Sequence, residues 1–311
     1  MQALLQNPYS IMVDFLIIGT PKAGTTSIQN YLSKHPEIFM PKQKEIHFFG
    51  KDLNNEKQLT KLDYHHFFKN STSREIKGEA SVFYLYSSSA FQEIYDYNPK
   101  MKLIVCFRNP VDFLISYHQD SIYVGIEEEP NFWKALDLET DRRNGKKIPK
   151  TNTFHESLYY SKMIDYAGEI KKFIELFGKE NIHVVIFDEF FKDPKSQLKS
   201  MLKFLGTKDT DFIPELFNNK NPRRSLRNKK LNSFIKNPNS IFKVLVKVII
   251  PFQSWRLKVS NFVRKANTTY TNVNTLSFEE KKVLSNRFNS LIIELENLFD
   301  LDLSDWKNKY L

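Results

Sequence analysis

The sequence predicts an α/β fold in which a central parallel β-sheet is flanked by helices, giving three layers. Three segments each combine a buried strand, a loop and an amphipathic helix, at residues 15–32, 102–117 and 181–206. Strands that alternate with helices are typical of parallel sheets. Continuous apolar runs are typical of strands covered on both faces. We therefore expect ligand-binding loops at the carboxyl ends of these strands.

The first segment reads FLIIGTPKAGTTSIQNYL over 15–32. Its apolar run breaks at Gly19, and the helix that follows carries Ile28 and Tyr31 on one face, with Pro36 just beyond its end. The second segment has a strand over 102–107, then Arg-Asn-Pro, then a helix. The two loops would open on the same crevice.

The third strand ends near Phe187, and the helix after Asp193-Pro194 closes at Gly206. A long C-terminal helix opens at Leu276-Ser277 and has a structural role in this interpretation. Its apolar stripe consists of Leu284, Phe288, Leu291, Ile292, Leu295 and Leu298.

The chain is basic, with a formal net charge of +10 and a pI near 9.3. This charge indicates polyanionic partners such as nucleotides, sulfated or phosphorylated sugars, nucleic acid or an anionic membrane surface, and it does not choose among them. The one cysteine, Cys106, lies in an apolar run and cannot form an intramolecular disulfide. We therefore expect a buried thiol and a reducing compartment, the cytoplasm.

The sequence predicts neither a signal peptide nor a membrane span, because no uncharged apolar stretch reaches the roughly 18 residues that a span needs. The nearest candidate is SIFKVLVKVIIPF at 240–252, which carries Lys243 and Lys247. We interpret it as a buried amphipathic helix, with an interfacial membrane helix as the alternative.

The loop after the first strand is similar to a P-loop whose lysine is displaced. Gly19 and Gly24 have the spacing of a nucleotide-triphosphate loop, but Thr25 stands where the lysine belongs and Lys22 lies inside the loop. Amides and hydroxyls of residues 23–27 at a helix N-terminus would still hold a phosphate. No apolar strand ends in an aspartate that would complete a magnesium site, so metal-assisted triphosphate chemistry is poorly supported.

Two further segments carry chemistry. Arg108 at a strand end and Ser116 in the following helix would converge on one anion. The segment PKQKEIHFFG offers Glu45 and His47 as bases, with Lys42 and Lys44 beside them. If the segment is extended, Glu45 and His47 point to the same side.

The motif TPKAGTTS resembles the 5′-phosphosulfate loop of sulfotransferases that use 3′-phosphoadenosine 5′-phosphosulfate (PAPS). The resemblance implies that Lys22 contacts the leaving phosphate and the sulfuryl group. The segment CFRNPVDFLISYHQ is similar to the family's 3′-phosphate motif, which implies that Arg108 and Ser116 hold the 3′-phosphate. The segments SLYYSKMIDYAGEI and NPRRSLRN also resemble the family, which implies that Tyr159 lies near the nucleotide and that Arg223 or Arg224 reaches the 3′-phosphate. The implied nucleotide-binding residues are Pro21, Lys22, Ala23, Gly24, Thr25, Thr26, Ser27, Arg108, Ser116, Tyr159, Arg223 and Arg224.

The stretch KEIHFF resembles a segment of the heparan-sulfate sulfotransferases and of many bacterial relatives. This resemblance implies that Glu45 is the base and that His47 supports it or orients the acceptor. Gly50 departs from the acidic residue found there in the heparan enzymes. The stretch GEASVFYLY also resembles the family, with Val82 in place of a proline, and implies that its side chains line the acceptor cleft. Those side chains are Glu79, Ser81 and Tyr84.

The sequence and these resemblances together predict a PAPS-dependent sulfotransferase that needs no metal, binds no nucleic acid and acts on a hydroxyl or amine, with a saccharide as the acceptor. The absence of repeats and of low-complexity linkers favours one domain over 1–311, with a nucleotide-binding core at about 12–210 and a basic loop and helical portion at about 218–311. Two alternatives remain: an atypical nucleotide kinase or NTPase, and a non-enzymatic polyanion binder.

Overall fold

The computed structural model describes residues 11–53, 58–73, 75–214, 225–226, 268–269 and 276–311. The chain forms two compact units. The first comprises Met1–Leu114, Thr153–Asn218 and Phe278–Leu311, and the second comprises Ile115–Asn152 and Asn219–Ser277. The organisation as a single domain over 1–311 stays a prediction.

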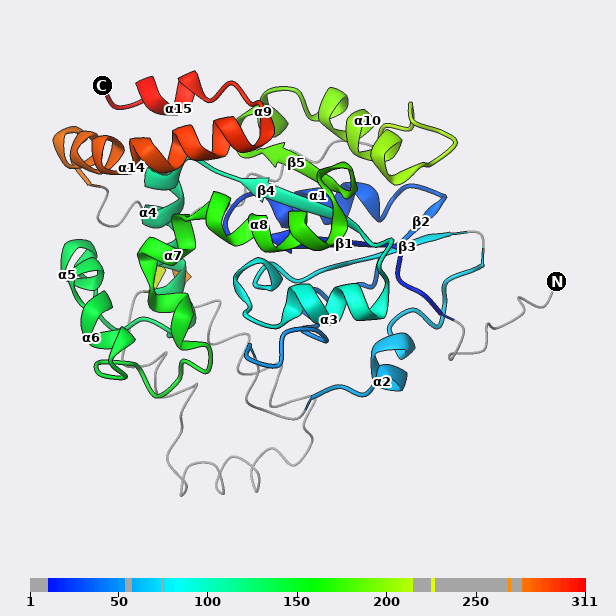
Figure 1. The fold of residues 1–311 in the computed structure, drawn as a ribbon, viewed down its shortest axis with the longest axis horizontal. Coiled ribbons are helices and arrows are strands. Elements are labelled where there is room, and N and C mark those ends of the chain that lie inside the picture. The colour runs from blue at the N-terminus through cyan, green and yellow to red at the C-terminus, as the bar shows by residue number, and fades with distance from the viewer. Residues whose placement is uncertain (1–10, 54–57, 74, 215–224, 227–267, 270–275) are drawn as a thin grey trace. The chain divides into compact units, whose positions relative to one another are not determined.

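The first unit is built on a five-stranded parallel sheet with the strand order β2-β3-β1-β4-β5 (Figure 1). The central strand β1 is completely buried, as expected for a strand covered on both faces. The strands are β1 Phe15–Gly19, β2 Ile38–Phe39, β3 Ile76–Ala80, β4 Lys102–Phe107 and β5 Ile182–Ile186.

Helices cover both faces of this sheet. Alternate side chains of β1, Phe15 and Ile17, belong to a core cluster shared with α1 (Thr25–Leu32) and α10 (Pro194–Leu205). Because neighbouring strand residues point to opposite faces, Leu16 and Ile18 lie on the other side. In Figure 1, α3 (Ala90–Tyr97) and α8 (Tyr166–Phe177) lie side by side along the sheet, and α8 also contacts α14 (Phe278–Phe299).

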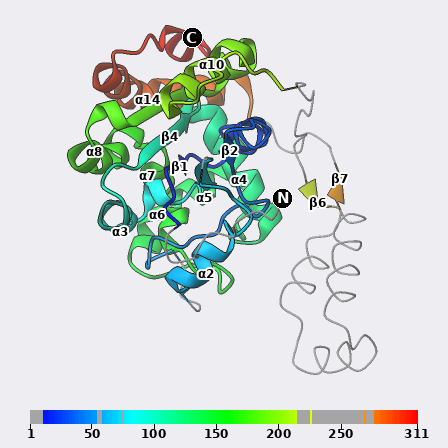
Figure 2. The same cartoon turned by 90° about the vertical axis from the view of Figure 1, so that its right-hand side faces the viewer.

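Short elements complete the two units. In the first, these are α2 Lys61–His66, η2 Tyr84–Tyr86, η3 His155–Leu158, α7 Tyr160–Ile164, η4 Lys179–Asn181, α9 Phe187–Lys192 and α15 Ser304–Asn308. The helix α4, Pro110–Val124, begins in the first unit and ends in the second. The second unit also contains α5 Phe132–Asp137, α6 Glu139–Arg143 and an antiparallel pair of two-residue strands, β6 Ser225–Leu226 and β7 Thr268–Thr269 (Figure 2).

The predicted α/β fold is confirmed, and the three predicted strand-loop-helix segments are present. Two strands were not predicted. The strand β2 has only two residues, and β3 reads IKGEA, which has neither an apolar run nor regular alternation. Its glycine is a packing requirement, since a Cβ on Gly78 would lie 2.0 Å from the ring of Phe15 on the neighbouring strand.

Local signals at the helix ends also hold. The Asp193 side chain accepts a hydrogen bond from the Ser196 amide at 3.1 Å, and Gly206 adopts a left-handed φ of 86° after α10. The C-terminal helix begins at Phe278 and buries Leu284, Phe288, Ile292 and Leu295 of the predicted stripe.

Two other predictions concern burial and membranes. The Cys106 thiol is buried, as expected. Within the described part of the chain, no helix is long and apolar enough to cross a membrane. The candidate segment 240–252 lies outside the described residues.

Candidate active site

The loop between β1 and α1 presents backbone amides at a helix start. Lys22 and Gly24 both adopt left-handed backbone conformations, with φ of 61° and 81°, and Ala23 between them does not. Such alternation turns successive N–H groups toward one point and forms an anion-binding concavity. In the described structure, no side chain caps α1 and no acidic residue lies in its first turn. The loop therefore suits an anion.

Lys44 supplies a cation at this loop. Its Nζ donates hydrogen bonds to Thr25 Oγ1 at 2.8 Å and to Thr26 Oγ1 at 3.0 Å. Thr25 occupies the position where an ordinary P-loop has its lysine, so an ammonium group reaches that place from another segment. Burial lowers the pKa of Lys44, although the nearby Glu45 carboxylate acts in the opposite direction. Sequence reasoning named Lys44 only as a neighbour of the base.

Arg108 joins the loop after β4 to the loop after β1. Its Nη1 donates a hydrogen bond to the backbone carbonyl oxygen of Lys22 at 3.0 Å. Its guanidinium lies over the ring of Phe187, 4.4 Å from the centroid, and its own carbonyl accepts from the Tyr166 hydroxyl at 3.0 Å. The prediction that the two loops share one edge of the sheet is confirmed.

Two phenylalanines of α9 pack against the loop between β1 and α1, residues 20–24, which we call the anion loop. A Cβ placed on Gly24 would lie 3.0 Å from the ring of Phe191 and 3.4 Å from that of Phe187. Phe191 is 44% exposed, although it is a large apolar residue. An aromatic surface therefore lies open beside the loop, and no motif in the sequence pointed to it.

Glu45 and His47 lie together, but not for the reason that the sequence suggested. The segment is not extended, because both residues adopt left-handed conformations, with φ of 56° and 52°. Their side chains nevertheless meet, with 3.6 Å between His47 Nε2 and Glu45 Oε2. Lys44 Nζ lies 3.6 Å from Glu45 Oε1, so the carboxylate is close to both neighbours. It is 34% exposed, which leaves it accessible to a substrate.

Burial changes the titration of both groups. It raises the pKa of Glu45, with the Lys44 ammonium acting in the opposite direction. Burial also lowers the pKa of His47 to about 4, so the imidazole is neutral at pH 7. Its Nδ1 is buried and finds no hydrogen-bond partner among the described residues. A neutral imidazole next to a carboxylate is able to orient a substrate hydroxyl or amine.

The end of β3 shapes the segment that carries Glu45. The Glu45 amide donates to the Ala80 carbonyl at 2.9 Å, as a strand partner would, and the Val82 amide donates to Glu45 Oε2 at 3.0 Å. Beyond this point, the amides of Gly50 and Lys51 donate to the Glu93 carboxylate at 3.0 and 3.3 Å. The segment has no regular secondary structure, yet its backbone is held from outside.

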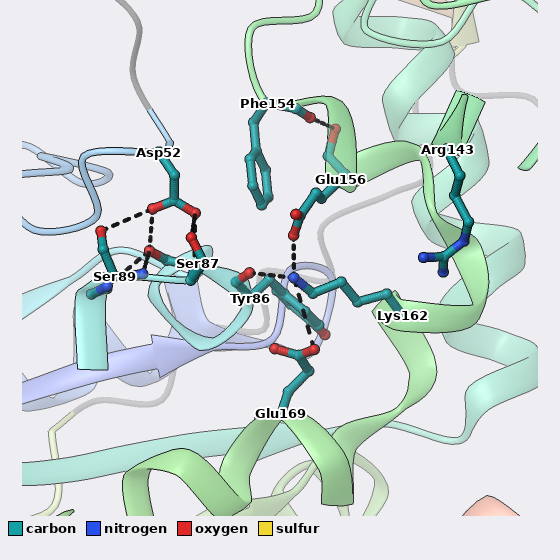
Figure 3. Close-up of polar contacts among 12 residues, drawn as sticks. Asp52, Tyr86, Ser87, Ser89, Arg143, Phe154, Glu156, Lys162 and Glu169 are labelled. Atoms are coloured by element: carbon teal, nitrogen blue, oxygen red, sulfur yellow. Dashed lines mark hydrogen bonds and ion pairs between the residues drawn. The ribbon is translucent and has the colours of Figure 1, made fainter. Parts of the chain in front are cut away.

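Figure 3 shows how the following residue, Asp52, is anchored. Its carboxylate accepts hydrogen bonds from the hydroxyls of Ser87 and Ser89 and from the amide and hydroxyl of Ser88. Burial acts to raise the pKa of Asp52, but hydrogen bonds from the Ser87 hydroxyl and from the amide and hydroxyl of Ser88 lower it below its usual value. The segment that carries the candidate base Glu45 is therefore tied at its C-terminal end, through Asp52, to the turn after η2.

The same view shows Phe154 and the cluster around Lys162. Lys162 Nζ contacts Glu156, lies 3.9 Å from Glu169 Oε1, and donates to the Tyr86 carbonyl at 2.9 Å. This ammonium has three oxygen partners and fixes α7 against η2.

Two half-buried aromatic rings continue from His47. The centroid of Phe83 lies 6.4 Å from that of the imidazole. Phe154 packs edge-on against Phe83 at 5.9 Å. Neither ring is fully covered, so together they offer an apolar surface next to the candidate base.

The prediction that Glu79, Ser81 and Tyr84 line an acceptor cleft is wrong. Each of these residues is 0% exposed, so none of them can touch a substrate in this structure. They belong to β3 and to the turn that follows it, where their polar side chains bond to one another inside the protein. A single sequence segment gives no sign of which polar side chains will be covered.

The other predicted residues are distributed as follows. Pro21 and Ala23 are buried in the loop and Thr25 is buried at the start of α1, whereas Thr26 is exposed. Tyr159 is half-buried between η3 and α7. Ser116 is 8% exposed on α4, in the second unit, and its pairing with Arg108 around one anion stays a prediction. Arg223 and Arg224 lie outside the described residues.

This parallel sheet, with a loop after β1 whose amides at the start of α1 suit an anion, defines a P-loop-like α/β protein. The family model described as "Sulfotransferase domain" matches residues 13–268, which is most of the chain. The chain therefore belongs to the sulfotransferase domain family, as its motifs predicted.

Curated relatives are distant. The chain is 26% identical over 191 residues to heparan sulfate glucosamine 3-O-sulfotransferase 5 of Mus musculus and of Homo sapiens, covering 61% of this chain and 52% of each relative. It is 34% identical over 112 residues to the membrane-associated sulfotransferase kil1 of Dictyostelium discoideum, covering 35% of this chain and 23% of that protein. The chain thus spans about half the length of the two heparan enzymes and about a quarter of the length of kil1.

Among solved structures, a sulfotransferase from Alicyclobacillus acidocaldarius has a similar fold. It superimposes with a TM-score of 0.69 at 24% identity, covering 96% of this chain and 100% of that one. At this identity the likeness concerns the fold alone.

Proposed function

We propose that this protein transfers the sulfuryl group of PAPS to a hydroxyl or amine of a saccharide. The observation that carries the proposal is the position of Lys44, whose ammonium bonds to the hydroxyls of Thr25 and Thr26 and lies 3.6 Å from Glu45. One cation thus connects the anion loop with the candidate base, so both halves of a transfer reaction meet at one point.

In this reaction the residues have distinct tasks. Glu45 accepts the proton of the acceptor hydroxyl or amine as the acceptor atom forms its bond to sulfur. The bond between sulfur and the bridging phosphate oxygen breaks, and the electron pair leaves on the 5′-phosphate. Lys22, Lys44 and the loop amides stabilise the negative charge that develops there, as in loose phosphoryl transfer. His47, neutral at pH 7, orients the acceptor.

The residues present fit the donor nucleotide. The uncapped start of α1 suits its 5′-phosphosulfate. Arg108, held by Lys22 and Phe187, supplies a forked cation for the 3′-phosphate. The exposed ring of Phe191 beside Gly24 offers a face for a purine base. No step of this proposal requires a metal.

A saccharide acceptor is supported by two features. Phe83 and Phe154 form an apolar surface next to His47, and an aromatic face suits the C–H side of a sugar ring. The relatives named above include heparan sulfate enzymes. The chain's charge of +10 would also favour an anionic glycan. The cytoplasmic location inferred from the single cysteine belongs to this proposal as well.

The first test is isothermal titration with 3′-phosphoadenosine 5′-phosphate, using Mg-ATP as the comparison ligand. We expect stoichiometric binding of the bisphosphate and none of Mg-ATP. Arg108→Ala should weaken binding of the bisphosphate strongly. Preference for Mg-ATP would favour the nucleotide kinase, and binding of neither would favour the polyanion binder.

The second test measures transfer of radiolabelled sulfate from PAPS to a panel of acceptors. The panel contains heparan-type oligosaccharides with free amino and hydroxyl groups, an uncharged oligosaccharide and 4-nitrophenol. Sulfation of a saccharide that is lost in Glu45→Gln would support the proposal. Sulfation of the phenol alone would contradict the saccharide assignment while leaving the donor assignment intact.

A further inference from the structure

Glu79 is a buried carboxylate that the reaction above does not use. It is 0% exposed at the end of β3, and no ion pair with it occurs among the described residues. Burial raises its pKa to about 7, with hydrogen bonds from Ser81 and Tyr84 acting in the opposite direction. Taking a carboxylate out of water without a cation is costly, so it calls for a compensating structural reason.

The carboxylate of Glu79 organises three hydroxyl groups. Its Oε1 accepts from Ser81 Oγ, and its Oε2 accepts from the hydroxyls of Tyr84 at 3.0 Å and Tyr64 at 3.3 Å. Because each hydroxyl uses its O–H to donate a hydrogen bond to Glu79, its oxygen lone pairs are left to accept hydrogen bonds from other groups. In its ionised form the Glu79 carboxylate only accepts hydrogen bonds, and that form fixes the same polarity for all three hydroxyls.

Two of these hydroxyls hold the backbone of residues 47–49, which follow the candidate base Glu45. Ser81 Oγ accepts from the His47 amide at 3.1 Å. The Tyr84 hydroxyl accepts from the amides of Phe48 at 3.0 Å and Phe49 at 3.4 Å. Three consecutive amides therefore depend on hydroxyls whose orientation is set by one carboxylate.

This part of the backbone is strained and needs such support. Glu45 and His47 both have left-handed φ values, a conformation that residues with a side chain seldom adopt. The segment has no helix or strand of its own to retain it. Bonds from the rigid end of the sheet provide that constraint, because β3 pairs directly with β1 and β2.

We infer that Glu79 is a positioning residue for the transfer reaction: through Ser81 and Tyr84 it holds residues 45–49 in the strained conformation that brings the Glu45 carboxylate and the His47 imidazole together. This inference rests on the proposed function. Glu79 itself touches neither substrate. It acts on the rate through the geometry of the base, since displacement of a catalytic group by about 1 Å costs about 10²-fold in rate.

The test compares four single variants and one double variant, Glu79→Gln/Ser81→Ala. Glu79→Gln removes the acceptor-only carboxylate, Ser81→Ala removes the acceptor of the His47 amide, and Tyr84→Phe removes that of Phe48 and Phe49. The matched control is Tyr86→Phe, which also deletes one buried tyrosine hydroxyl from η2, but one that donates to the Met163 carbonyl instead. Each variant is assayed for kcat with PAPS and saccharide, for Kd of the bisphosphate, and for amide hydrogen exchange over 45–49.

We expect Glu79→Gln, Ser81→Ala and Tyr84→Phe to lower kcat by about 10- to 100-fold, to leave Kd of the bisphosphate within about twofold, and to speed exchange at residues 47–49. Tyr86→Phe should change none of these. The double variant Glu79→Gln/Ser81→Ala should be no slower than Glu79→Gln, since both act through one path.

Unchanged kcat in Ser81→Ala and Tyr84→Phe would overturn the inference, and these variants decide the matter even if Glu79→Gln does not fold. Equal losses in the Tyr86→Phe control would also overturn it, because they would indicate a general packing defect. If the wild type transfers no sulfate, the proposed function fails by itself. The exchange of residues 47–49 then still reports whether Glu79 holds the segment.

Discussion

Arg108 donates a hydrogen bond to the backbone carbonyl of Lys22, so the cation at the end of β4 is fixed to the anion loop at the end of β1. The two strands are neighbours in the sheet, which brings their carboxyl ends together. A forked, planar cation held in this way suits one phosphate while it stabilises the loop that we propose binds another.

Replacing this arginine tests that arrangement. Arg108→Lys keeps the charge but loses the fork and the stacking on Phe187. We expect the Kd of the bisphosphate to rise about 10- to 100-fold, which is typical when a hydrogen bond to a charged group is lost. Titration calorimetry measures the effect. The control Arg143→Lys changes an exposed arginine of α6 that pairs with Glu139, and it should leave Kd unchanged.

Lys44 is predicted to act in the chemical step. Lys44→Met removes the ammonium next to Thr25, so kcat should fall about 10²-fold or more, whereas KM for the acceptor should change little. Lys42→Met in the same segment is the control, because Lys42 is exposed. Equal losses of kcat in the two variants would contradict a specific role for Lys44.

The pH dependence of kcat should follow the titration of the Glu45 carboxyl group. A base works only when deprotonated, and burial raises the pKa of Glu45, so activity should fall at a higher pH than for an ordinary carboxyl group. His47 has a pKa of about 4 and is already neutral across this range. His47→Asn should therefore retain the acidic limb of the profile. Loss of that limb in His47→Asn would assign it to the imidazole instead.

His183 on β5 makes stability depend on pH. Burial lowers its pKa to about 4, its Nε2 has no hydrogen-bond partner among the described residues, and its ring stacks on Phe204. The unfolded chain binds a proton near pH 6.5 and the folded one does not, so stability falls as pH decreases from about 6.5 to about 4.

In His183→Gln this contribution is absent. The decrease in Tm between pH 7.5 and pH 5 should therefore be smaller than in the wild type by about 2 °C or more. Scanning calorimetry at the two values measures it. An equal decrease in both proteins would mean that His183 is protonated without cost in the folded state.

The aromatic surface of Phe83 and Phe154 next to His47 should contribute to binding of the acceptor and not to binding of the nucleotide. Phe83→Ala removes the ring that packs against Phe154, so KM for the saccharide should rise by about two- to tenfold, as expected for loss of an aromatic contact. Kd of the bisphosphate should remain the same. Phe91→Ala, which removes a ring that packs on Phe173 of α8, is the control. A similar rise in both variants would point to a loss of stability.

Several features could be predicted because they depend on neighbours in the sequence. The run from Phe15 to Gly19, the cap at Asp193 and the stripe of the C-terminal helix are local patterns, and the structure agrees with each. The strand β3 could not be predicted in this way. Its residues Lys77, Gly78 and Glu79 follow no strand pattern, and position 78 requires glycine because the Phe15 ring occupies the space of a side chain there.

In the candidate site, too, some residues could be predicted from local sequence and some contacts could not. Lys22, Arg108 and Glu45 could be named from their motifs and from the resemblance of these motifs to the family, and their roles stay predictions. The partners of Lys44 could not be predicted, because Thr25 and Thr26 are far away in the sequence and the ammonium reaches them only after folding.

The sequence alone determined the three strand-loop-helix segments, the loop after the first strand and the residue types of the segment around Glu45, since these are set by local periodicity and by short motifs. Only the tertiary structure decided which polar groups are covered. Glu79, Ser81 and Tyr84 have residue types that suit a substrate cleft, but the packing of β3 against its neighbours buries them. Burial arises from contacts between distant segments, and it turned three predicted cleft residues into the internal support of Glu45 and His47.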